Sequence, residues 1–274
     1  MPGTDIGKLG LKDSYGAFIG GEFQLPGGDT FAALNAATGE HLASIVECGL
    51  DEIGQAVAAA RKALPAWRVT APEDRSSLLL KLADALENDV ARLSVIDALD
   101  IGRRLQEVRI DYQIAIAQYR YFAAAVITHE GFGRPIPNGY LIAKREPIGV
   151  CGQIIPWNVP AIMVAFKLAP ALAAGNTVVL KPDENASLST LELAKHIAGI
   201  FPPGVVNIVP GSGERAGAAL TAHPDVNKLA FTGSSEVGRL VAHAGAERLI
   251  PVSLELGGKS PNIVFPDVED LGNL

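Results

Sequence analysis

The sequence predicts an α/β fold with a doubly wound parallel sheet, and three observations carry this prediction. From Gly149 onward, five short apolar segments alternate with stretches long enough to hold a helix. Strands joined by such long connections run parallel, and the crossover helices cover both faces of the sheet. The composition agrees, because 48% hydrophobic and 19% charged residues are typical of a globular chain with a core. Twenty-nine glycines and eighteen prolines supply the turns between the elements.

Residues 1–133 are predicted to be mainly helical behind a short extended start. Residues 18–23 are expected to form a tight hairpin, because the Gly-Gly pair at its centre allows positive φ. A second extended stretch is expected over 35–45. A helix capped by Asp51 should follow, since apolar residues recur there every three or four positions.

Two further helices are expected before residue 133. One begins near Pro72, where acidic residues occupy the first turn, and the other covers about 104–128. Three aromatic residues of the latter helix share one face by their spacing: Tyr112, Tyr119 and Phe122. We expect this face to pack the helix against a sheet.

Residues 134–148 are predicted to form a hairpin. Two prolines interrupt the helical pattern, and the Asn138-Gly139 pair that follows is a typical hairpin turn. Residues 140–147 mix polar and apolar side chains in the manner of a two-sided strand. Both features indicate a two-stranded element at this point of the chain.

Residues 149–256 carry the alternation of strands and helices, and residues 257–274 follow them. The five predicted strands are 150–155, 176–180, 205–209, 228–231 and a run that ends at Leu254. A helix rich in small residues is expected over 159–174, where a glycine ends it. The next helix is expected to be capped near Ser187 or Ser189.

Composition and patterning argue against several classes of protein. A net charge of −7 leaves no basic surface for nucleic acid. No secretory signal is expected, because residues 1–5 lack a basic start followed by an apolar run. No membrane span is expected either, because the longest apolar window, 161–174, is short and contains Lys167. Two cysteines indicate a reducing compartment, so we expect a cytoplasmic location, and we expect no metal site.

Two glycine-rich turns compete for a phosphate-binding role. The G-x-G-x-x-A pattern at 211–216 follows a strand, but such patterns are common by chance. It also lacks an acidic ribose partner, because Glu236 lies inside the next predicted helix. The turn at Gly233 and Ser234 is the stronger candidate. There Ser234 opens a helix whose N–H groups can meet a pyrophosphate.

Polar side chains follow three of the predicted strands. Lys181 and Glu184 can reach the hydroxyls of a ribose, and a solvated charged loop is the alternative. The Asn158 amide can donate to an oxyanion beside an apolar wall formed by Trp157, although Asn158 equally fits the N-cap of the next helix. Glu255 ends an apolar run just before two glycines, which suits a general base. For this residue the alternative is a glutamate that closes an ordinary turn.

Four motifs thus lie on successive strand ends: PWN at 156–158, KPDE at 181–184, FTGSSEVG at 231–238 and LELGGK at 254–259. In order and spacing they resemble the aldehyde dehydrogenase superfamily. The resemblance covers essentially the whole chain and corresponds to the amino-terminal, NAD-binding half of the family. It implies a Rossmann-like NAD-binding domain made of 1–133 and 149–256. Residues 134–148 are implied as an oligomerisation hairpin and 257–274 as the start of a truncated catalytic domain.

The resemblance also implies a role for each motif. Asn158 is the implied oxyanion-hole amide and Glu255 the implied general base. Lys181 and Glu184 are the implied ligands of the adenosine ribose, and Ser234 is the implied pyrophosphate contact. The other implied cofactor contacts are Ile155, Trp157, Gly213, Gly233, Val237, Gly238, Leu256 and Gly257. The implied cofactor is NAD, and NADP is disfavoured because a carboxylate such as Glu184 repels a 2′-phosphate.

The implied activity is the NAD-dependent oxidation of an aldehyde to a carboxylic acid. In the family, a cysteine thiolate attacks the aldehyde, and the glutamate later activates the water that releases the acid. The residues implied to line the substrate tunnel are Val159, Met163 and Phe166. The implied assembly is a homo-oligomer, a dimer or a tetramer, in which the 134–148 hairpin pairs with another subunit.

Neither cysteine of this chain matches the nucleophile of the family. Cys151 lies within an apolar strand, and Cys48 lies far upstream and outside every motif. The chain alone is therefore expected to be inactive, as an incomplete part of the enzyme. A non-catalytic, truncated dinucleotide-binding remnant is the alternative. A relative that acts on acyl-CoA or acyl phosphates is a third interpretation.

Overall fold

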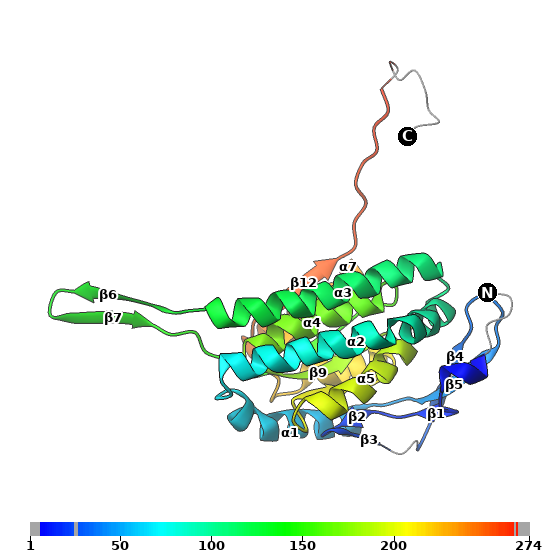
Figure 1. Ribbon diagram of the computed structural model, residues 1–274, viewed down its shortest axis with the longest axis horizontal. Helices are drawn as coiled ribbons and strands as arrows, with labels where there is room; N and C mark the ends of the chain where they lie inside the picture. The colour runs from blue at the N-terminus through cyan, green and yellow to red at the C-terminus, as the bar shows by residue number, and fades with distance from the viewer. Residues whose placement is uncertain (1–5, 25–26, 266, 268–274) are drawn as a thin grey trace.

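The computed structural model describes residues 6–24, 27–265 and 267. Its largest element is a seven-stranded sheet in the order β12-β11-β8-β9-β10-β2-β3 (Figure 1). The strands in that order are β12 (Val252–Leu256), β11 (Lys228–Gly233), β8 (Val150–Ile154), β9 (Thr177–Lys181), β10 (Val206–Ile208), β2 (Phe18–Ile19) and β3 (Glu22–Phe23). The first five of these strands run parallel, which confirms the predicted parallel sheet.

The hairpin predicted at 18–23 is present, and it also extends the main sheet. β2 pairs antiparallel with β10, with Phe18 opposite Ile208, and β3 pairs antiparallel with β2. The buried Asn207 side chain accepts a 2.9 Å hydrogen bond from the Gly20 N–H, which ties the turn to the sheet. This pairing was not predicted, because it joins segments 187 positions apart in the sequence.

A second sheet consists of β1 (Ser14–Tyr15), β5 (His41–Val46) and β4 (Thr30–Leu34). The extended stretch expected over 35–45 is wrong in its first half, because 35–40 form the turn between β4 and β5. The Asn35 side chain accepts from the Ala37 N–H at 3.0 Å, and its carbonyl accepts from the Gly39 N–H at 2.8 Å. These local hydrogen bonds take the place of strand pairing.

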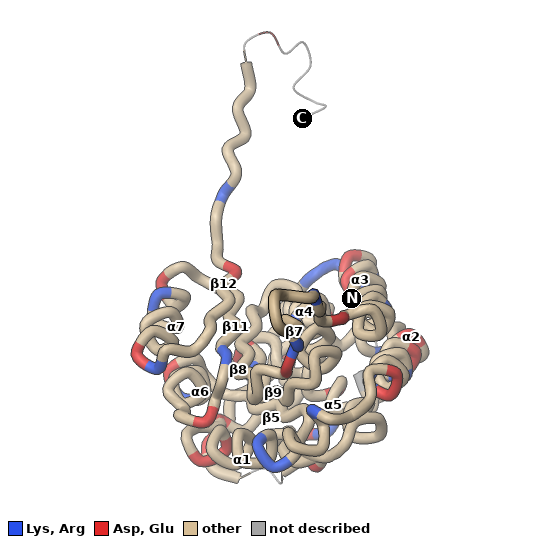
Figure 2. The backbone as a smooth tube through the Cα atoms, turned by 90° about the vertical axis from the view of Figure 1, so that its left-hand side faces the viewer, with Lys and Arg blue, Asp and Glu red and all other residues tan. Residues whose placement is uncertain are grey.

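Helices cover both faces of the main sheet, as the doubly wound topology requires (Figure 2). On one face lie α1 (Leu50–Trp67), α6 (Ala218–Ala222) and α7 (Ser235–Arg248). On the other lie α4 (Pro160–Ala173) and α5 (Leu188–Ile200), with α2 (Pro72–Ile101) and α3 (Leu105–Ala125) packed against them. Each face has its own apolar core: Leu168 and Leu191 belong to one, and Val57 and Val241 to the other.

The predicted helix starts are confirmed, with corrections to two of the caps. α2 begins at Pro72, and Ser187 is the N-cap residue of α5, but its side chain does not cap the helix because its hydroxyl donates to the Asp183 carbonyl at 2.7 Å. Asp51, however, does not cap α1, because the helix starts one residue earlier and Asp51 lies in its first turn. Gly49 occupies the N-cap, and its N–H donates to Glu52 Oε2 at 2.8 Å. The carboxylate that serves this helix end is therefore inside the helix.

α3 is present as predicted and continues into a short 3-10 helix, η2 (Val126–Thr128). Its aromatic face does not meet a sheet, however. Tyr112 and Tyr119 are buried where α3 packs against α2 and α4. The prediction is wrong on this point because α4 already covers the sheet, so α3 forms an outer layer on helices.

The predicted hairpin over 134–148 is formed by β6 (Phe132–Ile136) and β7 (Gly139–Ala143). It projects from the body of the chain beyond the end of α3 (Figure 1). Asn138 adopts the left-handed conformation at the turn, with φ of 66°. Three large apolar side chains on the hairpin are more than half exposed: Phe132, Tyr140 and Ile142. The hairpin therefore presents an uncovered apolar surface.

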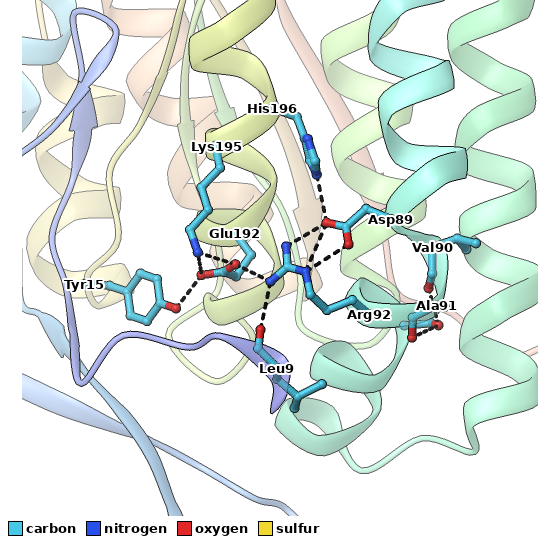
Figure 3. A network of polar contacts seen from close by, with 10 residues as sticks. Leu9, Tyr15, Asp89, Val90, Ala91, Arg92, Glu192, Lys195 and His196 are labelled. Atoms are coloured by element: carbon cyan, nitrogen blue, oxygen red, sulfur yellow. Dashed lines mark hydrogen bonds and ion pairs between the residues drawn. The ribbon is translucent and has the colours of Figure 1, made fainter. Parts of the chain in front are cut away.

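A buried carboxylate ties the N-terminal segment to two helices (Figure 3). Glu192 of α5 is fully buried and accepts hydrogen bonds at 2.6 Å from Arg92 Nη1 of α2 and from Lys195 Nζ. The Tyr15 hydroxyl donates to the same carboxylate. Arg92 Nη1 also donates to the Leu9 carbonyl at 3.2 Å. These bonds hold residues 9–15 and α2 against α5.

Candidate functional site

Four parallel strands end side by side at one edge of the main sheet, and the predicted site residues lie at or just after these strand ends. Ile154 lies opposite both Lys181 and Phe231 in the ladder, and Gly233 lies opposite Leu256. The segments 155–158, 181–184, 233–238 and 255–257 therefore meet at one edge. In open α/β sheets this carboxyl edge is where ligands bind.

Lys181 and Glu184 form an ion pair at the end of β9. The Lys181 side chain is buried, and its Nζ donates to Glu184 Oε2 at 2.7 Å. Burial acts to raise the pKa of Glu184, but the hydrogen bond and charge of Lys181 outweigh it, so the pKa lies below its ordinary value. The backbone of Gly213 also acts to lower the pKa of this carboxylate. The turn is thus an ordered ion pair with a buried lysine, unlike a fully solvated charged loop.

The N-terminus of α7 lies directly after β11. Ser234 is the N-cap residue, and its hydroxyl oxygen accepts from the Val237 N–H at 3.2 Å. The remaining N–H groups of this first turn and the helix dipole both favour an anion. Gly238 brings the helix close to the neighbouring strand, because a Cβ there would lie 2.4 Å from the Leu256 side chain. Glu236 lies inside α7, as predicted.

Residues 155–159 connect β8 to α4. Ile155 is buried, and its N–H donates to the Lys181 carbonyl at 3.2 Å, whereas Trp157 and Asn158 are exposed at the edge. The alternative role of Asn158 as a helix cap is wrong, because Val159 is the N-cap residue of α4 and no side chain caps this helix. The Asn158 carbonyl accepts from an arginine of the α2–α3 connection at 3.3 Å. Its side-chain amide is not used as a cap.

Glu255 lines a cavity of about 580 Å³ between α4 and strands β8, β11 and β12. The alternative of a glutamate in an ordinary turn is wrong, because Glu255 lies inside β12, opposite Thr232 of β11. Two of the three residues implied for the substrate tunnel, Met163 and Phe166, also line this cavity. Val159 is not among the lining residues. The cavity thus joins the candidate base to apolar side chains.

Lys167 is a site residue that sequence reasoning did not select. It lies on α4, is 9% exposed and lines the same cavity as Glu255. Burial lowers the pKa of Lys167 to about 8, while the charge of Glu255 acts in the opposite direction and that of Lys228 in the same one. A signal was present in the sequence, because one lysine interrupts an otherwise apolar helix. Such a lysine faces either solvent or a polar site.

Both cysteines are free, buried thiols. Burial raises the pKa of Cys48 to about 12, and the carboxylates of Glu52 and Glu47 add to this effect. Burial likewise raises the pKa of Cys151 to about 11. A nucleophilic cysteine needs a lowered pKa, so both thiols have the properties of core residues.

Within residues 6–24, 27–265 and 267, no group of three or more His, Cys, Asp or Glu side chains could hold a metal ion. In the same part of the chain, no helix has the length and apolar character needed to cross a membrane.

The parallel doubly wound sheet, with a helix N-terminus at its carboxyl edge, defines a Rossmann-like nucleotide-binding class of domain. Residues 24–273 match the aldehyde dehydrogenase family. The chain belongs to this family, which confirms the resemblance drawn from the four motifs.

Individual relatives agree with this assignment. The chain is 43% identical over 270 residues to the fluoroacetaldehyde dehydrogenase of Streptantibioticus cattleyicolor. This match covers 97% of this chain and 53% of that protein. It is 46% identical over 261 residues to retinal dehydrogenase 2 of Homo sapiens, and this match covers 92% of this chain and 50% of that protein. The NAD⁺ complex of the Bacillus cereus aldehyde dehydrogenase superposes with a TM-score of 0.92 at 41% identity, over 98% of this chain and 56% of that one. The chain spans about half the length of these relatives.

Proposed function

We propose that this chain supplies the cofactor-binding part and the general base of an enzyme that oxidises an aldehyde to a carboxylic acid with NAD. The observation that carries the proposal is that the four motifs meet at one edge of the sheet. Two relatives are named for the oxidation of fluoroacetaldehyde and of retinal, which supports an aldehyde as the class of substrate. The free cysteines support a cytoplasmic location.

The proposed division of the chain follows the fold. Residues 1–133 and 149–256 together form the NAD-binding domain, and 134–148 form a hairpin for subunit pairing. Residues 257–274 belong to the start of a catalytic domain. In support, the hairpin projects from the body, and residues 257–265 after β12 also lead away from it (Figures 1 and 2).

The residues at the sheet edge fit NAD in charge and in shape. Glu184 can accept hydrogen bonds from the ribose hydroxyls, and Lys181 beside it can donate one. The first turn of α7 at Ser234 can hold the pyrophosphate. The further proposed contacts are Ile155, Trp157, Gly213, Gly233, Val237, Gly238, Leu256 and Gly257. A 2′-phosphate would meet the negative charge of Glu184, which favours NAD over NADP.

The chain's own side chains then serve the reaction in two places. NAD, when bound, accepts a hydride from the substrate. Asn158 would donate its side-chain N–H to the substrate oxygen, where negative charge develops. Glu255 would accept a proton from the water that releases the acid. Lys167 shares the cavity with Glu255, and the two charges attract each other.

The reaction also needs a nucleophile, and neither cysteine of this chain meets its requirements. Cys48 and Cys151 are buried and have raised pKa values. We therefore propose that the chain alone does not turn over aldehydes. Purified chain mixed with NAD and propanal should give no NADH absorbance above a protein-free control. Steady NADH formation that is lost in a Cys48→Ala, Cys151→Ala variant would contradict this.

The cofactor assignment is tested by calorimetric titration of the chain with NAD and with NADP. Glu184→Gln should narrow the preference for NAD by about 1 kcal/mol, because it removes the repulsion of a 2′-phosphate at a partly solvated position. Glu22→Gln makes the same change of charge on β3, the outermost strand on the opposite side of the sheet from β12, and serves as the control. An unchanged ratio of the two affinities in Glu184→Gln would show that Glu184 does not face the ribose.

A non-catalytic dinucleotide-binding protein is the second candidate, and the inert cysteines favour it. Both candidates predict NAD binding, so they differ in the reaction. Adding the remaining half of a homologous aldehyde dehydrogenase as a fusion should restore NADH formation under the first candidate. A folded fusion that binds NAD and stays inactive would favour the second.

We also propose that the chain forms a homo-oligomer through the β6–β7 hairpin. Its exposed Phe132, Tyr140 and Ile142 form an apolar surface, and its strand edges can pair with another chain. Light scattering should therefore give a mass above the 28.6 kDa of one chain. Tyr140→Lys with Ile142→Lys should lower that mass, and a wild-type monomer at micromolar concentration would refute the proposal.

A further inference from the structure

We propose that Arg103 is a positioning residue for Asn158, and that it aims the Asn158 side-chain amide at the place where the substrate oxygen lies. The inference rests on the proposed function, which gives Asn158 the role of an oxyanion donor. Arg103 lies in the connection between α2 and α3, outside all four motifs. It reaches a residue 55 positions further along the chain, because its Nη1 donates to the Asn158 carbonyl at 3.3 Å.

The connection that carries Arg103 is short, and its backbone is fixed. Gly102 ends α2 in the left-handed conformation, with φ of 73°, and its N–H donates to the Ala98 carbonyl at 3.1 Å. A Cβ at Gly102 would also fall 3.0 Å from the Ala36 Cβ, so both features favour glycine there. Arg104 is already the N-cap residue of α3. Arg103 therefore leaves the chain from a rigid corner between two helices.

The guanidinium of Arg103 is held by two carboxylates of α3. Its Nη1 forms an ion pair with the buried Asp111, and its Nη2 lies 3.6 Å from Glu107 Oε2. Nη1 carries two N–H groups, so it can donate to Asp111 and to the Asn158 carbonyl at once. Bonds between ionised partners are stronger than bonds between neutral groups. The Asp111 carboxylate thereby fixes the direction in which Arg103 meets Asn158.

The helix that follows does not hold the Asn158 carbonyl. The first backbone hydrogen bond of α4 is accepted by the Val159 carbonyl, at 3.1 Å, so the carbonyl before it lies outside the helical ladder. On the other side, the Ile155 N–H is bonded to β9. The chain bends at 157–159, between these two points. The hydrogen bond from Arg103 holds the peptide plane of Asn158 within this bend.

The orientation of this peptide plane decides where the Asn158 amide points. The carbonyl and the side chain of a residue leave the same Cα, so a fixed carbonyl leaves the side chain only its own χ angles to vary. An oxyanion donor acts only when it lies within hydrogen-bond distance of the developing charge. A displacement of about 1 Å in such a site can cost about a hundredfold in rate. Arg103 thus acts on the reaction through Asn158.

Backbone dynamics of the ligand-free chain test the positioning. The Val159 N–H shares a peptide plane with the Asn158 carbonyl. In NMR relaxation measurements its order parameter should fall from about 0.85 in the wild-type chain to below about 0.6 in Arg103→Ala. The Ile155 N–H keeps its own bond to β9 and should keep its order parameter. No fall at Val159, or an equal fall at Ile155, overturns the proposal.

Two variants of the same connection provide the controls. Arg104→Ala removes the neighbouring arginine, which donates to a glutamate of α3 at 2.9 Å, and should leave the order parameter of Val159 unchanged. Arg103→Lys should also retain it, because a single nitrogen of Arg103 serves both Asp111 and Asn158, and an ammonium carries three donors. A fall in Arg104→Ala as large as that in Arg103→Ala would overturn the particular role of Arg103.

Catalysis tests the effect on Asn158, in the fusion with the remaining half of a homologous aldehyde dehydrogenase. Arg103→Ala should lower kcat by about tenfold or more and change the KM for NAD by less than about twofold, because an oxyanion donor acts in the transition state. In an Asn158→Ala background the same substitution should cost less than about twofold. Equal losses in both backgrounds overturn the proposal. A wild-type fusion that makes no NADH refutes the proposed function, and the order parameters then decide whether Arg103 positions Asn158.

Discussion

Replacing Lys167 by methionine should stabilise the chain at neutral pH. The folded chain lowers the pKa of Lys167 from 10.5 to about 8, mainly because the ammonium is buried. Below pH 8 the folded state must hold a charge that the unfolded state hydrates better. Since one pKa unit corresponds to ~1.4 kcal/mol, this costs about 3 kcal/mol at pH 7. Methionine has a similar length and no charge, so Lys167→Met removes the cost.

The sign of the pH dependence provides the sharper test. Between pH 8 and 10.5 the unfolded state binds more protons at this residue than the folded state, so the stability of the wild-type chain rises with pH. The gain from Lys167→Met should therefore fall to about 1.5 kcal/mol at pH 9.5 and vanish above pH 11. Urea unfolding at several pH values measures both quantities.

The matched control is Lys62→Met, which removes an exposed lysine of α1. It should change neither the free energy of unfolding nor its dependence on pH by more than about 0.5 kcal/mol. If Lys167→Met proved neutral or destabilising at pH 7, or if its effect did not shrink at high pH, then the ammonium is solvated in the folded chain.

Three further outcomes follow from the described contacts. Glu192→Gln should lower the free energy of unfolding by about 2 kcal/mol in urea titrations, because it removes the buried charge that the N-terminal segment, α2 and α5 share; no change would mean that the network is solvated. Cys48 and Cys151 should both resist a disulfide reagent at pH 8 until urea unfolds the chain, since burial holds both thiols protonated; fast labelling of the native chain would contradict this. Gly149→Ala should destabilise by about 2 kcal/mol or more, because φ is 131° and a Cβ would fall 2.2 Å from the Asn227 side chain; a wild-type melting temperature would refute it.

The sequence by itself was enough to predict the parallel sheet, the order of its elements and the segments that lie at the ends of its strands. These features depend on local periodicity and on glycines and caps, which act over a few residues. The proximity of Lys181 to Glu184 could be predicted for the same reason, because the two residues of this ion pair are three positions apart. The Ser234 cap of α7 is also a local feature.

Contacts between distant segments were decided only by the tertiary structure. The addition of β2 to the sheet and the packing of α3 on helices depend on which surfaces remain uncovered once the other elements are in place. Lys167 and Glu255 line one cavity although a large part of the chain separates them, and Glu47, which follows β5 of the other sheet, accepts a hydrogen bond from the Ser212 N–H. Burial and electrostatic coupling arise from neighbours in space, and the spacing of residues along a chain does not encode those neighbours.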